Sequence, residues 1–203
     1  IGLAFGIVVV IGIMHAAWPI DATTSAHATL ADLLEACGRR LSALLDRHAT
    51  PVGGAARSRA HAVGFVHEVE LYGTQFGRPA EDLARLARPV LELAALVGCV
   101  ESLHGPASRT LAGASRSGLR QFSRAVHRDC RLLGRGLRAL PGERPTCRPE
   151  DLASPQCLPR LAAPRPPDPG STTREACPLI AALLLDLAAA LTADERPAHR
   201  DAA

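Results

Sequence analysis

The sequence predicts an all-α protein with an N-terminal transmembrane helix, then an antiparallel helical bundle with a proline-rich loop before its last helix. Residues 1–14 carry no charged or strongly polar side chain. Apolar residues make up 47% of the chain but aromatic residues only 3%. The core must therefore be built from Leu, Ala and Val, which favours close-packed helices over a sheet. After residue 20, apolar residues recur at spacings of three and four, the period of a helix.

The predicted transmembrane helix covers residues 1–20. A span needs about 20 mostly apolar residues. Trp18 closes the apolar run and is a residue type enriched at the membrane–water interface. Pro19 follows and cannot continue a regular helix, because it has no N–H and its ring clashes with the preceding turn. We therefore expect Trp18 and Pro19 to mark the membrane interface. Because the chain does not begin with Met, we also expect a fragment whose span is truncated and can be preceded by others.

Two other interpretations of residues 1–20 stay open. A secretory signal peptide has basic residues before its apolar core, whereas no Arg or Lys precedes Arg39. A buried core helix of a soluble protein is the second alternative, because the run is short for a span.

The helical bundle is predicted over residues 21–140. N-cap residue types at 21–25 precede a first soluble helix that ends near His48. Pro89 should kink the third helix or split it in two. The other helices of the bundle are predicted over residues 55–72, 79–103 and 107–140.

The C-terminal part changes character at residue 141. Nine prolines fall within residues 141–173, which predicts a linker without a regular helix. A last helix is predicted over 174–195. Asp186 interrupts its apolar run, so we interpret it as a helix that packs on the bundle and not as a second span. Residues 196–203 are predicted to be a disordered tail.

The chemistry-bearing residues form no convincing catalytic or metal site. Without Lys, the chain has no P-loop motif. The Gly-Ala-Ser-Arg-Ser-Gly run at 113–118 resembles a nucleophile elbow, but its spacing is wrong and no strand precedes it. His61 and His67 are six residues apart and point in different directions on a helix. Cys147 and Cys157 could pair in an oxidising compartment. We therefore predict no enzyme activity, no catalytic residue, no metal and no cofactor.

Arginines line one face of the predicted helix over 107–140. One interpretation is a solvated face of an amphipathic helix. The other is a surface for anionic lipid headgroups, an acidic subunit or an anionic small molecule. Nucleic acid is not expected as a partner, because the net charge is only +3 and stacking aromatics are scarce. The candidates for an anionic contact are Arg116, Arg120, Arg124 and Arg128.

Residues 12–45 resemble the junction between membrane bundle and soluble domain in bacterial fusaric acid resistance proteins, the aromatic acid exporter type. The shared features are an apolar span ending in Trp18 and Pro19, a short polar step, and a Leu/Ala-rich amphipathic helix over 30–45. The resemblance implies an efflux transporter of the bacterial inner membrane that exports aromatic carboxylic acids or related toxic compounds. It also implies the lipid bilayer, further membrane helices or subunits, and an anionic substrate as partners.

Within such an efflux transporter, this chain would be a C-terminal fragment that supplies one span and the soluble helical domain. Arg-rich segments near a span tend to stay in the cytoplasm, so we expect the soluble domain there. The absence of Lys and Asn, with abundant Ala and Pro, indicates a GC-rich and bacterial coding sequence. The alternative is a membrane-anchored helical sensor or interaction domain without transport activity.

Overall fold

The computed structural model describes residues 24–44, 64, 81–107, 113–139, 147–161 and 171–193. Within these ranges the regular structure is helical and no strand occurs, which confirms the all-α class. The predicted span with Trp18 and Pro19, the tail at 196–203 and the predicted helix over 55–72, apart from residue 64, lie outside the described residues.

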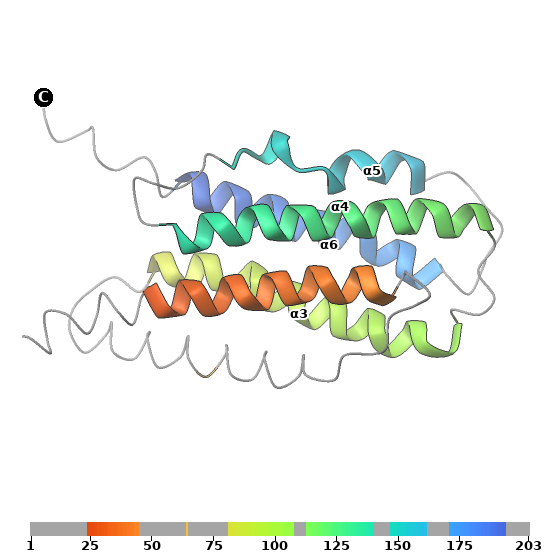
Figure 1. The fold of residues 1–203 in the computed structure, drawn as a ribbon, viewed down its shortest axis with the longest axis horizontal. Coiled ribbons are helices and arrows are strands. Elements are labelled where there is room, and N and C mark those ends of the chain that lie inside the picture. The colour runs from red at the N-terminus through yellow and green to blue at the C-terminus, as the bar shows by residue number, and fades with distance from the viewer. Residues whose placement is uncertain are drawn as a thin grey trace, which may run out of the picture.

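The described helices pack lengthwise around one apolar core (Figure 1). Helix 24–44, drawn in orange, lies beside α4 (Gly113–Arg138). The short helix α5 (Ser154–Leu161) follows α4 on the other side, and α3 (Glu81–Ala107) packs against α6 (Ser171–Ala193). α6 also contacts α4 and α5. Each fully buried Leu or Phe adds about 1.5–3 kcal/mol to the free energy of unfolding. The largest fully buried side chains are Phe122, Leu30, Leu34, Leu41, Leu93, Leu119, Leu133, Leu137, Leu152, Ile180, Leu184 and Leu187.

Glycines let helix 24–44 and α4 approach closely. A Cβ atom added to Gly38 would lie 2.9 Å from Cys130 Cβ and 3.1 Å from His127 Cα. A Cβ on Gly134 would lie 3.1 Å from Glu35 Oε1. The contacts therefore run in opposite order along the two helices, since the earlier residue of helix 24–44 meets the later residue of α4. The same reversal holds for α5, where Ser154 lies near Asp129 and Leu161 near Gly118.

Proline has less effect on α3 than the sequence suggested. The helix is continuous from Glu81 to Ala107, so it is neither split at Pro89 nor ended at His104. Pro89 is buried among the core residues of α3. A proline removes one backbone hydrogen bond, and the burial of the apolar face on both sides of Pro89 offsets that loss.

The prediction that residues 141–173 hold no regular helix was wrong. This stretch contains a 3-10 turn, η1 (Pro149–Asp151), the helix α5 and the first residues of α6. Pro155 is the second residue of α5, where a helix makes no use of its N–H group. Pro159 lies inside α5, but α4 and α6 both pack against this helix. Tertiary contacts thus stabilise a helix that its own composition would not.

α6 is the one described helix that is long and apolar enough, by length and composition, to cross a membrane. In the structure, 44% of that apolar window is buried inside the protein. The buried side of α6 faces α3, α4 and α5. Its exposed side carries Leu179, Ala182, Asp186 and Ala189. Apolar residues on the exposed side explain why a helix of the bundle core is also apolar enough to cross a membrane.

No disulfide joins the six cysteines, all of which lie within the described ranges, so the bond considered between Cys147 and Cys157 is not formed. Burial raises the pKa of Cys37 from 9.0 to about 12, and that of Cys177 likewise to about 12. Burial also raises the pKa of Cys130. The nucleophilic form is the thiolate. These buried thiols are therefore inert near neutral pH.

Thiol labelling should separate the cysteines by burial. In the native chain we expect a maleimide to modify the exposed Cys99 rapidly. A pKa of about 12 lowers the thiolate fraction of Cys37 near neutral pH about 1000-fold relative to a pKa of 9.0, so Cys37 should react only on unfolding. Mass spectrometry of peptides after timed labelling measures the rates. Equal rates at Cys37 and Cys99 in the folded chain would contradict the packing of helix 24–44 against α4.

Candidate anionic-contact surface on α4

α4 exposes a straight row of side chains from Ser117 to Arg138. The exposed residues are spaced alternately four and three apart, which keeps them on one line along the helix. They are Ser117, Gln121, Arg124, Arg128, Arg131, Arg135 and Arg138. The flanks of α4 are covered by helix 24–44 on one side and by α5 and α6 on the other. The exposed line is therefore narrow, and its last five positions are all arginine.

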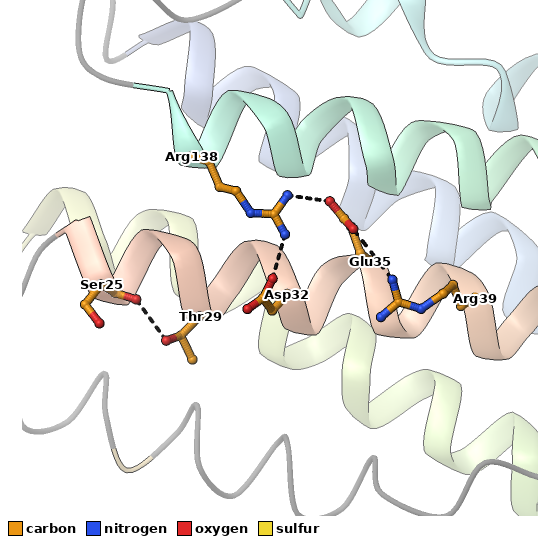
Figure 2. Close-up of polar contacts among 6 residues, drawn as sticks. All are labelled: Ser25, Thr29, Asp32, Glu35, Arg39 and Arg138. Atoms are coloured by element: carbon orange, nitrogen blue, oxygen red, sulfur yellow. Dashed lines mark hydrogen bonds and ion pairs between the residues drawn. The ribbon is translucent and has the colours of Figure 1, made fainter.

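Arg138 differs from the other arginines of this line because it is paired (Figure 2). Its Nη2 donates to Asp32 Oδ1 at 2.6 Å and its Nη1 to Glu35 Oε1 at 2.5 Å. Glu35 also pairs with Arg39 on its own helix, with a 3.6 Å separation. The hydrogen bonds to Glu35 and Asp32 raise the pKa of Arg138. This network joins the end of α4 to the middle of helix 24–44. Because Arg138 is partly exposed, solvent screening limits its contribution to about 1 kcal/mol.

The remaining four arginines, Arg124, Arg128, Arg131 and Arg135, are here called the arginine row. Among the residues that the structure describes, none of them forms an ion pair. The one acid on α4, Asp129, is completely buried and faces α5. Arg138 uses Asp32 and Glu35, the acids on the neighbouring helix. The arginine row is therefore a line of like charges without a described counter-charge.

The sequence-based candidates overlap with this surface in part. Arg124 and Arg128 belong to the arginine row. Arg120 is half-buried and lies off the exposed line. Arg116 lies in the first turns of α4, and its side chain is outside the described residues. Arg131 and Arg135 were part of the predicted arginine face but not among the four candidates. Their spacing alternates between four and three, but this pattern alone does not show that these arginines reach solvent.

Asp129 fixes the position of α5 against α4. Its Oδ1 accepts a hydrogen bond from the Ala153 N–H at 3.0 Å, and its Oδ2 accepts one from the Ser154 N–H at 2.7 Å. These N–H groups lie at the start of α5, where the helix offers no acceptor for them. A carboxylate there is also favoured by the helix dipole. The buried acid thus holds the helix that borders one flank of the exposed line.

The described residues offer little for covalent or metal chemistry. Within them, no group of three or more His, Cys, Asp or Glu side chains could hold a metal ion. The run at 113–118 that resembles a nucleophile elbow forms the first turns of α4. His61 and His67 lie outside the described residues. The arrangement that the described surface does support is electrostatic binding of an extended anion.

Comparison of the chain with protein-family models, with curated proteins and with solved structures finds no match. Membership of the fusaric acid resistance family therefore remains a prediction, carried by residues 12–45.

Proposed function

We propose that this chain belongs to a bacterial inner-membrane transport protein of the fusaric acid resistance type, which exports aromatic carboxylic acids or related toxic compounds. The chain would supply one span over residues 1–20 and an antiparallel helical domain on the cytoplasmic side. Further membrane helices or subunits would complete the transport path. Its own part in transport would be mechanical and electrostatic, without covalent chemistry.

The observation that carries the proposal is the direct connection between the apolar segment and the bundle. Only four residues separate residue 19 from the start of helix 24–44. That helix buries Ala26, Leu30 and Leu34 completely in the core. A span that ends at Trp18 and Pro19 would therefore be coupled to the packed domain through a short connection. A change in the tilt of such a span would act on the whole bundle.

The second candidate, a membrane-anchored sensor or interaction domain, is favoured by the arginine row, for which the described residues supply no acidic partner. It shares the anchor with the first proposal and differs in having no transport path. The two are separated by the number of hydrophobic segments encoded in frame before the codon for Ile1. Four or more such segments favour the exporter, and a start codon directly upstream favours the anchored domain.

Membrane attachment is tested by fractionation of cells that make the full chain. We expect the full chain in the membrane fraction, resistant to extraction with high salt. A chain without residues 1–20 should move to the soluble fraction, because it loses the apolar segment that a span requires. Recovery of the full chain in the soluble fraction would contradict both candidates.

Export is tested with the complete gene product. Cells that make it should accumulate less of a radiolabelled aromatic carboxylic acid than cells with an empty vector. Leu30→Arg places a charge in the core and should restore accumulation to the empty-vector level. An exposed matched change, Ala182→Arg, should not. Equal accumulation in all strains, with the protein inserted in the membrane, would favour the anchored domain.

A further inference from the structure

We infer that the arginine row on α4 binds the anionic headgroups of membrane phospholipids and so holds the bundle against the bilayer surface. The choice of a lipid partner rests on the proposed membrane attachment. The row itself rests on the described side chains.

The geometry of the row suits an extended anionic surface. From Arg124 to Arg135 the helix rises about 17 Å, and successive arginines are about 5 Å apart along its axis. The four exposed residues are spread along one line of the helix and are not clustered around one point. A single small anion would contact only one or two of them. A plane of lipid phosphates can contact them all, and the guanidinium group binds phosphate through two parallel hydrogen bonds.

The electrostatics favour an external partner. Four like charges at this spacing repel one another, and no described acid compensates them. Arg138 shows the contrast on the same line, because it pairs where Asp32 and Glu35 come within reach. The arginine row therefore gains more from an anionic surface than Arg138 does. At a membrane carrying anionic lipids, each such charge strengthens attachment.

The course of the chain favours lipid over an acidic protein segment. Asp32 meets Arg138, so the start of helix 24–44 lies at the Arg138 end of the exposed line (Figure 2). Residue 19, where the apolar segment ends, is five residues before residue 24. Five residues span at most about 17 Å. The row therefore begins on the part of the bundle that the connection keeps nearest to the expected membrane interface.

The row can be probed in the wild-type chain with phenylglyoxal, which modifies exposed arginines. The chain has no Lys that would compete for the reagent. The full chain is reconstituted with vesicles of phosphatidylcholine alone or with added phosphatidylglycerol, and modified peptides are quantified by mass spectrometry. We expect phosphatidylglycerol to slow modification of the arginine row about fivefold. Arg85 and Arg88, exposed on α3, should be modified at unchanged rates. At 1 M salt, where the screening length is about 3 Å, the protection should vanish.

A pair of matched variants gives a second measurement. The first variant replaces the arginine row with Gln, at Arg124, Arg128, Arg131 and Arg135. The second variant replaces four other arginines with Gln, at Arg39, Arg85, Arg88 and Arg148. Both lose the same charge from exposed positions. Native mass spectrometry of the detergent-solubilised full chain counts retained lipids. The first variant should lose its preference for phosphatidylglycerol over phosphatidylcholine by about fivefold or more. The second should keep it. Equal loss in both would reduce the effect to net charge and overturn the inference.

The outcomes separate this inference from the proposed function. Flotation with phosphatidylcholine vesicles reports on the apolar segment alone. If the chain floats there but phosphatidylglycerol does not protect the row, the inference fails and the membrane span stands. If the chain floats only with phosphatidylglycerol and the row is protected, the span fails and the inference stands. Protection in cell membranes but not in phosphatidylglycerol vesicles would overturn the inference in favour of an acidic protein.

Discussion

Asp129→Ala is expected to lower the free energy of unfolding by about 3–6 kcal/mol, because hydrogen bonds to charged groups contribute about 1.5–3 kcal/mol each. The substitution removes the acceptor for the N–H groups of both Ala153 and Ser154. Ser154 is completely buried, so water does not readily replace the lost carboxylate there. α5 should separate from α4 before the rest of the bundle unfolds. Denaturant titration of the full chain measures the loss, and hydrogen exchange at Ala153 and Ser154 locates it.

Two controls separate the cap from a general effect of removing a carboxylate. Asp129→Asn keeps the shape and one acceptor oxygen but turns an N–H₂ group toward a backbone N–H. It should therefore lower the free energy of unfolding by less than Asp129→Ala does. Asp186→Ala removes an exposed acid from α6 and should change the free energy of unfolding by less than about 0.5 kcal/mol. If Asp129→Ala cost no more than Asp186→Ala, the buried carboxylate would not be what holds α5.

The long helices could be predicted because their apolar residues repeat at the helical period. The predicted helices over 79–103 and 107–140 overlap α3 and α4 for most of their length. The predicted helix over 174–195 corresponds to α6, which begins three residues earlier. In each case the buried apolar stripe is long, so the stabilisation from its burial exceeds the cost of one proline in the helix. Pro89 in α3 and Pro178 in α6 both lie within continuous helices.

α5 could not be predicted, because what stabilises it is distant in the sequence. Its eight residues include Pro155 and Pro159, which argue against a helix. The carboxylate at its start comes from Asp129, and its packing partners are α4 and α6. Propensity and local periodicity report none of these contacts.

The arginine row could be predicted only in part, for a geometric reason. A helix turns 100° per residue, so four steps overshoot a full turn by 40°. A run with constant spacing of four, such as the one from Arg116 to Arg128, therefore winds around the helix. The exposed line follows the gap between flanking elements and alternates four with three. Which spacing reaches solvent depends on where helix 24–44 and α5 lie, and the sequence of α4 does not contain that information.

Gly38→Ala is expected to lower the free energy of unfolding by about 1–3 kcal/mol, although alanine is the better helix former. The added methyl group would meet Cys130 Cβ at 2.9 Å and the backbone of His127 at 3.1 Å. Neither atom is the end of a flexible side chain, so helix 24–44 must move away from α4. That movement would also strain the pairing of Arg138 with Asp32 and Glu35. Gly38→Leu should destabilise the chain further.

Gly98→Ala supplies the matched control, with the opposite sign. Gly98 lies inside α3, and a Cβ atom there would meet nothing within 4 Å. The same substitution should therefore raise the free energy of unfolding by about 0.5–1 kcal/mol through helix propensity alone. Both changes in stability are measured from the denaturant midpoints of the two variants and the wild type. The comparison requires that the free energy of unfolding depends on denaturant concentration with the same slope in all three. Because backbone propensity is common to the two sites, the difference between them isolates the close approach of helix 24–44 to α4. Two stabilised variants would mean that these helices are farther apart than Gly38 indicates.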